Sequence, residues 1–146
     1  MLSRTICLLI LLLINVWCFS QQPEIFSTAD GAIAGYDPVA FFKESKSVAG
    51  KKEFSLNWND ATWYFSSAGN RDAFKASPEK YAPQYGGWCA YGTADGHKSP
   101  TQAETWTIVN DKLYFNYNMN VKKKWGSDQK GYIEKADKNW PKLRKE

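Results

Sequence analysis

The sequence has few of the side chains that bind metals or act as nucleophiles. Of its 146 residues, three are cysteines and one, His97, is a histidine. Two of the cysteines, Cys7 and Cys18, lie in the first part of the chain, which leaves Cys89 as the only thiol after it. A disulfide within residues 21–146 is therefore excluded, and so are four-cysteine zinc and iron–sulfur sites.

A long apolar run is also missing, except at the start of the chain. Residues 6–19, "ICLLILLLINVWCF", follow the positively charged Arg4. The run is short for a membrane-spanning helix and has the order of a secretory signal peptide. We expect residues 1–20 to be a signal peptide cleaved after about Ser20, so that the mature protein is secreted or periplasmic. Lipidation at Cys18 and retention of an uncleaved leader as an anchor are the alternatives.

The charge balance lacks a strong excess of either sign. Nineteen Lys and Arg stand against 15 Asp and Glu, for a formal net charge of +4, and much of the excess lies in Lys122–Lys124 and the C-terminal tail. Proteins that bind nucleic acid usually carry a stronger basic stripe, so we expect solvated helix faces and no nucleic-acid partner. We also expect no stable membrane span once the leader is removed.

Signatures of an enzyme are missing as well. The spacing supports no pair of catalytic carboxylates, no glycine-rich phosphate loop and no Ser-His-Asp arrangement. The sequence therefore favours a binding or accessory module over an enzyme. Aromatic residues, by contrast, are abundant, with seven Trp, eight Tyr and eight Phe. Because each buries a large area, packing of these rings is expected to replace disulfides as the source of stability.

Local patterns predict one domain over residues 35–146, preceded by a loose segment at residues 21–34. Residues 35–42, "GYDPVAFF", read as a turn that leads into a short apolar strand. Residues 52–59 alternate apolar and polar side chains, and Asn59-Asp60 is a dipeptide that a tight hairpin accepts. A strand at residues 61–67 completes this predicted hairpin.

Helices are predicted after each of two hairpins. Ser66 or Ser67 is expected to cap a helix that ends near Ala76, with Ala68 and Phe74 facing inward. A second hairpin is predicted around Asn110-Asp111, since apolar runs flank that turn.

The C-terminal part is predicted to be helical at residues 120–126 and 128–145. Four apolar residues recur at helical spacing and are expected to pack on the sheet: Tyr132, Ile133, Ala136 and Trp140. The predicted fold class is therefore α+β, a small antiparallel sheet built from hairpins and packed against a central helix and C-terminal helices.

Two separated segments resemble the YHS domain family. They are Asp-Pro-Val at residues 37–39 and "WYFSSAGNRDAFKASPEKY" at residues 63–81. The family has Asp-Pro-Val-Cys near its start, then a strand that ends in Cys-Ser, followed by Cys, Phe, Pro and Tyr at fixed intervals. Phe74, Pro78 and Tyr81 match those intervals, and the chain from Gly35 to Trp140 is similar to the exported branch of the family.

The family's metal ligands are replaced in this sequence. Ala40 stands where the family has the cysteine after Asp-Pro-Val, and Ser66 and Asn70 occupy the next two cysteine positions. The histidine of the family name falls on Phe65. Alanine and phenylalanine cannot coordinate a metal, and Ser and Asn oxygens are poor ligands for soft ions. The resemblance therefore implies the fold and not the family's metal site.

Four interpretations remain open for Cys89 and His97, which lie eight residues apart in a glycine- and aromatic-rich stretch. Cys89 is a buried structural thiol in the first. In the second, the two side chains bind a transition metal such as copper, with Met119 or Asp37 as a third ligand. In the third, His97 activates Cys89 for thiol catalysis.

A small-ligand or glycan pocket is the fourth interpretation. Its predicted lining is Tyr36, Asp37, Tyr85, Trp88 and Tyr91. Aromatic surfaces bind sugars and cations, although aromatic residues more often form a core. The function we expect is a secreted or periplasmic YHS-like module that binds a metal ion, copper, through Cys89 and His97. The alternative is a structural or small-ligand module with an inert Cys89, and a thiol-dependent enzyme is third.

Overall fold

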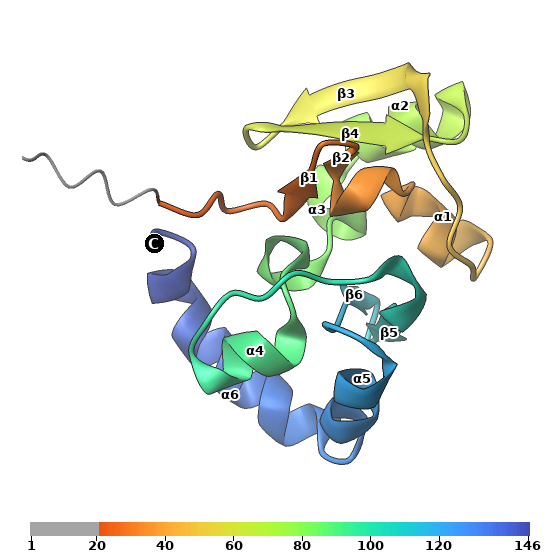
Figure 1. The fold of residues 1–146 in the computed structure, drawn as a ribbon. Helices are drawn as coiled ribbons and strands as arrows, with labels where there is room; N and C mark the ends of the chain where they lie inside the picture. Colours follow the sequence, from red (N-terminus) through yellow and green to blue (C-terminus); the bar gives the residue numbers. More distant parts are fainter. Residues whose placement is uncertain (1–20) are drawn as a thin grey trace, which may run out of the picture.

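A computed structural model describes residues 21–146 and shows an α+β fold, which confirms the predicted class (Figure 1). The predicted signal peptide at residues 1–20 lies outside the described residues. The strands and helices follow one another as β1 Ser27–Thr28, β2 Gly31–Ala32, α1 Pro38–Lys43, β3 Lys51–Trp58, β4 Ala61–Phe65, α2 Ala68–Ala76, α3 Pro78–Tyr81, α4 Ala90–Asp95, β5 Thr107–Val109, β6 Lys112–Tyr114, α5 Met119–Gly126 and α6 Gln129–Leu143.

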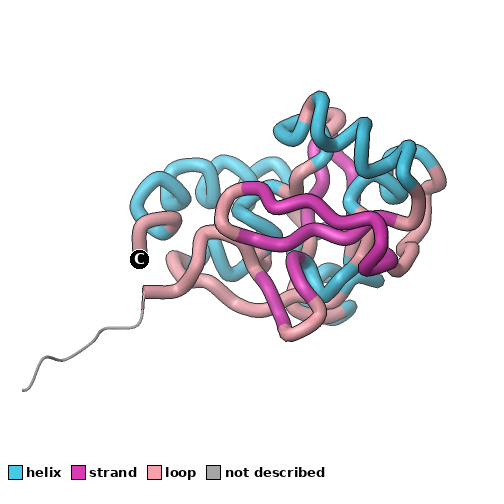
Figure 2. The backbone as a smooth tube through the Cα atoms, turned by 90° about the horizontal axis from the view of Figure 1, so that it is seen from above, coloured by secondary structure: helices cyan, strands magenta, loops and turns pink. Residues whose placement is uncertain are grey.

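The strands pair as three antiparallel hairpins, β1–β2, β3–β4 and β5–β6, which stay separate from one another. The hairpins predicted at Asn59-Asp60 and Asn110-Asp111 are confirmed. All four of these turn residues have φ between 49° and 59°. Two successive residues with positive φ give the type I′ turn, whose twist matches that of the paired strands. Seen from above, β3–β4 is the longest strand pair (Figure 2).

Asp60→Gly is expected to stabilise the protein by about 0.5–1 kcal/mol, because glycine occupies the left-handed region without the strain of a side chain. Urea unfolding checks this expectation. Asp72→Gly is the matched control, since Asp72 is exposed inside α2 and glycine should destabilise that helix by a similar amount. Equal destabilisation by both substitutions would contradict the assigned turn.

Residues 35–42 do not form the predicted strand, because α1 begins at Pro38. The Asp37 carboxylate accepts hydrogen bonds from Val39 N at 2.9 Å and from Ala40 N at 3.3 Å. An aspartate cap followed by proline in the first turn is a helix start signal. The Asp-Pro pair therefore starts a helix here, and not a turn into a strand.

Residues 21–34 are not the loose segment that we predicted. Ile25 and Phe26 are buried, and Phe26 N donates to the Gly86 carbonyl at 2.8 Å. The Phe26 and Trp88 rings lie 5.2 Å apart. Gly86 has φ +62°, and a β-carbon there would collide with the Glu24 carbonyl, so this close approach requires glycine. The segment is held by contacts far away in the sequence.

Helix α2 forms as predicted, with Ser67 as its cap. The Ser67 hydroxyl accepts from Asn70 N at 3.1 Å, and Phe74 is fully buried. Ala68 is exposed, so the prediction that it faces inward is wrong. Phe74 contacts the rings of Trp58, Trp63 and Phe65 at 5.1–5.6 Å, so this helix anchors the core of the β3–β4 half.

A second core lies at the other end of the molecule, between α4, α5 and α6 (Figure 1). Helix α6 packs its apolar face mainly on α4, and not on the sheet as predicted. The fully buried members of this second core are Ala90 of α4, Trp125 of α5 and Ala136 of α6, and the buried strand residue that packs with them is Tyr114 of β6. The short strands leave little sheet surface at this end, which explains the difference.

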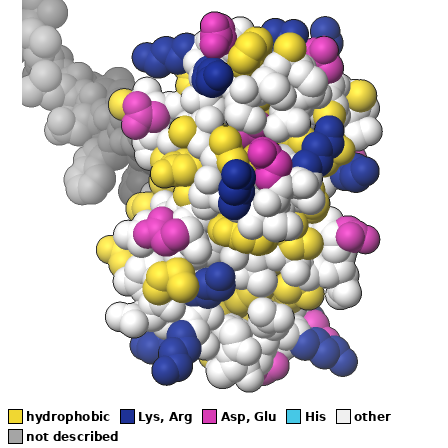
Figure 3. All heavy atoms as spheres, turned by 90° about the vertical axis from the view of Figure 1, so that its right-hand side faces the viewer, with side chains coloured by type: hydrophobic (Ala, Val, Ile, Leu, Met, Phe, Trp, Pro, Cys, Tyr) yellow, Lys and Arg dark blue, Asp and Glu magenta, His cyan; other side chains and the backbone are white. Residues whose placement is uncertain are grey.

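The face shown in Figure 3 mixes side chains of both charges around a band of hydrophobic side chains. The mixture agrees with the modest net charge of the chain. A groove of about 600 Å³ lies between α1, β5 and α5, and its lining includes Phe42, Trp106 and Ile108. None of the helices within residues 21–146 combines the length and the apolar character that a bilayer span requires.

Candidate functional site

Cys89 lies at a backbone junction just before α4. Its N–H donates to the Ser99 carbonyl at 3.0 Å, and it forms an isolated parallel bridge with Phe115, next to β6. The next residue, Ala90, donates to the Phe115 carbonyl at 2.9 Å. These bonds fix the Cys89 backbone from two sides, and the residue is only 1% exposed. The position of the thiol is therefore set by the fold.

The sulfur has polar neighbours although it is buried. Tyr117 N and Gly92 N donate to Sγ at 3.2 and 3.4 Å, and the thiol faces Asn116 Oδ1 at 3.6 Å. Burial raises the pKa of the Cys89 thiol, and the backbone N–H donors partly oppose that shift because they stabilise the thiolate. The thiol is therefore protonated at neutral pH, in an environment that can also accommodate the anion.

A cavity of about 250 Å³ brings Cys89 and His97 together. Its other lining residues are Tyr91, Gly92, Ser99, Tyr117 and Val121. The absent side chain of Gly92 leaves this space open, since a β-carbon there would lie 3.3 Å from both His97 Nε2 and Ser99 Oγ. Cys89 and His97, the only thiol and the only imidazole within residues 21–146, therefore line the same cavity, which their spacing in the sequence did not predict.

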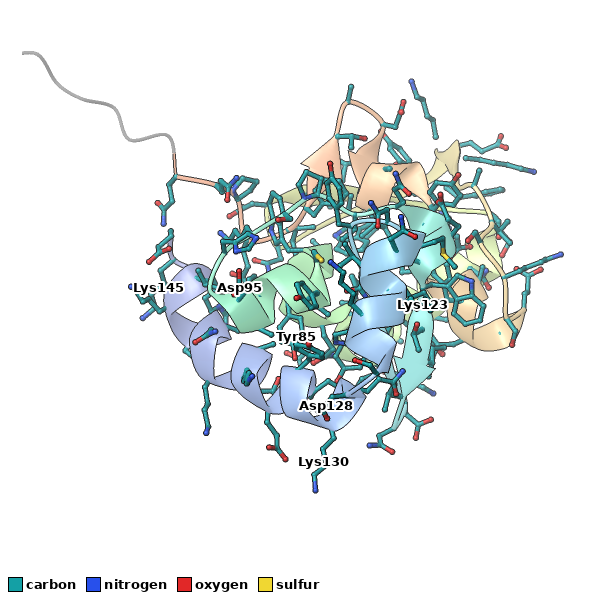
Figure 4. All side chains as sticks on the ribbon, turned by 60° about the horizontal axis from the view of Figure 1, so that its bottom comes forward. Tyr85, Asp95, Lys123, Asp128, Lys130 and Lys145 are labelled. Carbon is teal, nitrogen blue, oxygen red and sulfur yellow. The ribbon has the colours of Figure 1, made fainter. Side chains whose placement is uncertain are left out.

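The His97 ring has one nitrogen beside a carboxylate and the other near Gly92. Nδ1 lies 3.6 Å from Asp95 Oδ2, while Nε2 is the ring atom closest to Gly92. The His97 N–H donates to the Gly92 carbonyl at 3.0 Å, just after α4 ends. Figure 4 shows Asp95 at that end of α4. At 3.6 Å the contact with Asp95 is longer than a hydrogen bond, and the His97 and Asp95 side chains are 55% and 74% exposed.

Among the described residues, the cavity of Cys89 and His97 has no third strong metal ligand in its lining. Within residues 21–146, no group of three His, Cys, Asp or Glu side chains could hold a metal ion. Met119, one of the two candidates for a third ligand, is 52% exposed and does not line the cavity. Asp37, the other, is buried in a separate hydrogen-bond network. A site here would have two protein ligands.

The five residues predicted to line a ligand pocket do not gather around one cavity. Tyr91 lines the cavity of Cys89. Tyr85 and Trp88 are buried: the Tyr85 hydroxyl donates to Asp137 Oδ1 at 2.8 Å, and Trp88 Nε1 donates to the main-chain carbonyls of residues 23 and 24. Tyr36 forms an isolated bridge with Ala49 and packs on the first core. Most of these rings therefore join chain segments.

The Asp37 carboxylate is saturated with hydrogen bonds. Besides the two donors from α1, its Oδ2 accepts from Ser66 N at 2.8 Å, Ser66 Oγ at 2.7 Å and Asn70 Nδ2 at 2.8 Å. Ala40, Ser66 and Asn70, which the resemblance places at the cysteine positions of the YHS family, all contact Asp37. Because Ala40 offers no ligand atom and the polar groups are engaged, this cluster does not fit the family's metal.

Asn116 is a residue of this site whose role the sequence left open. Its side chain is fully buried, and its Oδ1 accepts from Tyr91 N at 3.2 Å in addition to facing the thiol. Its Nδ2 has no hydrogen-bond partner among the described residues. The pair of amides in "NYN" at the end of a strand was the available signal, but it did not show which amide points inward.

The free energy of unfolding is expected to fall as the pH rises above about 9. Burial raises the pKa of Cys89, Tyr85 and Tyr114 above their ordinary values, so the unfolded chain loses these protons first. Each group contributes a slope of at most about 1.4 kcal/mol per pH unit. Urea unfolding between about pH 8 and about pH 10.5 measures the effect. Tyr85→Phe should flatten the curve, and a stability that rises over this range would contradict the assigned burial.

Comparison with protein-family models, curated proteins and solved structures finds no match to this chain. The YHS-like assignment therefore stays a prediction from the resemblance. What the site does has to be inferred from the side chains and distances described above.

Proposed function

We propose that this chain is a secreted or periplasmic binding or accessory protein that holds copper(I) between Cys89 and His97. The observation that carries the proposal is that these two side chains line the same cavity of about 250 Å³. A thiolate is a soft ligand that selects copper(I), and an imidazole also suits copper. The two residues are the only such donors in residues 21–146 apart from Met119.

The surroundings of the sulfur support this chemistry. Metal binding requires loss of the thiol proton, and burial alone would oppose it. The N–H groups of Gly92 and Tyr117 point at Sγ, so the thiolate formed on binding would be stabilised by two donors already in place. Nε2 is the proposed second ligand atom, because it is the His97 ring atom nearest Gly92, which also lines the cavity.

Copper(I) fits this donor set better than zinc does. Structural zinc sites use four ligands in a tetrahedron, and catalytic ones use three ligands and a water. The cavity offers two ligands, and the side chains of Tyr91, Tyr117 and Val121 form most of the remaining wall. Tyr117 is 50% exposed, so this wall leaves the ion accessible from solvent.

A copper(I) titration against a competing chelator tests the proposal on the purified protein. We expect one copper(I) per chain and no comparable binding of zinc. His97→Ala should weaken binding by about tenfold or more, since even a ligand's supporting partner is worth that much. Met119→Leu is the matched control, because Met119 does not line the cavity, and it should leave the affinity unchanged. Equal affinities of wild type and His97→Ala would exclude His97 as a ligand.

Membership in the YHS-like family is part of the proposal. The contacts of Ala40, Ser66 and Asn70 with Asp37 support it, because positions that share one metal in a family have to lie together in the fold. In this chain a hydrogen-bonded carboxylate takes the place of that metal, and the soft-ligand site lies elsewhere, at Cys89.

The second candidate is a structural or small-ligand module with an inert Cys89. The partners of the sulfur favour it, since a thiol that is 1% exposed and bonded to Asn116, Gly92 and Tyr117 is satisfied without a metal. Failure of copper(I) to bind at one equivalent would select this candidate. A thiol-dependent enzyme ranks third, because the raised pKa of Cys89 works against a nucleophilic thiolate.

A further inference from the structure

A second cleft shares no lining residue with the Cys89 cavity. Its volume is about 480 Å³, within the range of small-molecule sites. Five segments build it: residues 24–25, residues 58–59 at the β3–β4 turn, residues 79–86, Lys112 of β6, and residues 137–144 of α6 and its end. The cleft therefore lies where both halves of the molecule meet, a common place for a ligand.

Aromatic rings form part of its wall. Trp58 and Trp140 are half-buried, so a part of each indole reaches the cleft. The Tyr85 ring lies 6.0 Å from Trp140 at 66°, and its hydroxyl bond to Asp137 fixes it on α6. Figure 4 shows Tyr85 beside that helix. The rings are thus held in place by packing before any ligand arrives.

Three carboxylates and two cations line the cleft, which gives it one net negative charge. Glu24 is paired with Arg144 at 2.6 Å, and Asp137 accepts the Tyr85 hydroxyl. Among the described residues, Glu79 and Lys112 make no ion pair, and they carry opposite charges. The cleft therefore carries too little net charge to select a strongly charged anion or cation.

Uncommitted hydrogen-bonding groups are present as well. The side-chain amides of Asn59 and Gln84 line the cleft, and within residues 21–146 neither makes a hydrogen bond to another protein group. Each amide can donate and accept at once. Together with the Glu79 carboxylate and the Lys112 ammonium, they form a mixed set of acceptors and donors around the rings.

We propose that this cleft binds a neutral oligosaccharide. A sugar ring has faces of C–H groups, which carry slight positive charge and stack on the negative face of an indole. Its hydroxyls donate and accept, as the amides of Asn59 and Gln84 and the groups of Glu79 and Lys112 require. A neutral ligand also suits a wall that carries only one net charge. This site is independent of copper binding at Cys89.

Calorimetry and tryptophan fluorescence on the purified full chain test the proposal. They measure the binding of cellotriose, maltotriose and triacetylchitotriose. At least one of them is expected to bind and to change the indole emission. Trp140→Ala should weaken binding about tenfold, the loss of a stacking contact of ~1.4 kcal/mol. Glu79→Gln combined with Gln84→Ala should weaken it similarly. These two residues lie outside the buried core, so this variant tests the site even if Trp140→Ala unfolds.

Trp106→Ala is the matched control, because Trp106 is also half-buried but lines the separate groove beside α1. It should leave saccharide affinity unchanged, and so should Cys89→Ser. Absence of binding by all three saccharides overturns the proposal. Binding that Trp106→Ala weakens as much as Trp140→Ala, or that the double variant leaves unchanged, overturns the assignment to this cleft.

Discussion

Cys89→Ser is expected to abolish copper(I) binding, with a loss of affinity of more than about 100-fold. Replacing a residue that merely supports a ligand already costs about 10–100-fold, and Cys89 supplies the ligand atom itself. A serine oxygen is a hard donor that remains protonated, so it does not replace a thiolate for a soft ion. The measurement is the same chelator competition that defines the wild-type affinity.

The serine variant should keep its fold. Its hydroxyl can accept from Gly92 N and Tyr117 N and donate to Asn116 Oδ1, as the thiol does. Thermal unfolding of the apo protein checks this. Ser99→Ala is the control within the same cavity, since Ser99 lines the wall without being a soft ligand. If Cys89→Ser binds copper(I) as tightly as the wild type, the sulfur is not a ligand and the proposed function is wrong.

Asp37→Ala is expected to lower the free energy of unfolding by about 3–5 kcal/mol. The substitution removes the acceptor of five hydrogen bonds, from Val39 N, Ala40 N, Asn70 Nδ2 and two groups of Ser66. Loss of the helix cap alone costs about 1 kcal/mol, and each buried donor left without a partner adds to it. Urea unfolding at neutral pH measures the difference.

Asp30→Ala is the matched control for this stability change. Asp30 is exposed, and its side chain accepts no hydrogen bond from the described residues, so the change should lie within about 0.5 kcal/mol. A loss of less than about 1 kcal/mol for Asp37→Ala would mean that the carboxylate does not link α1, β4 and α2. That result would also contradict the proposal that the Asp37 network takes the place of a metal.

Elements with strong local signals could be predicted from the sequence. The turns at Asn59-Asp60 and Asn110-Asp111 are defined by residue types that tolerate positive φ, so both hairpins follow from a few neighbouring residues. The α2 cap at Ser67 is a local signal of the same kind. Such signals act within a few residues and do not depend on the rest of the fold.

Two elements were predicted wrongly, for different reasons. One is stabilised by contacts that are distant in the sequence, and the other has a local sequence signal that fits two structures. Residues 25–26 are ordered by the Gly86 carbonyl and the Trp88 ring, some sixty residues away. Asp37-Pro38 is compatible with either a turn or a helix start, and the apolar residues after it fit a strand or a short buried helix. Periodicity cannot decide between these over so few residues.

The sequence predicted which residues of the candidate site could carry chemistry, but not how they are arranged in space. Cys89 and His97 were identified by the scarcity of thiols and imidazoles, but their spacing does not determine whether they meet. They line the same cavity because α4 ends at Gly96, which has φ +93°, and the His97 N–H donates back to the Gly92 carbonyl. The predicted aromatic pocket shows this limit of sequence analysis more clearly. A tyrosine such as Tyr85 can either line a cavity or join two chain segments, and the residue type does not distinguish these two roles.

X-ray absorption at the copper edge of the copper(I)-loaded protein tests the central claim most directly, because it reports the atoms bound to the ion. The account predicts one sulfur and one nitrogen neighbour per copper, from Cys89 and His97, with the nitrogen lost in His97→Ala. Only nitrogen and oxygen neighbours, or a spectrum that His97→Ala leaves unchanged, would contradict it.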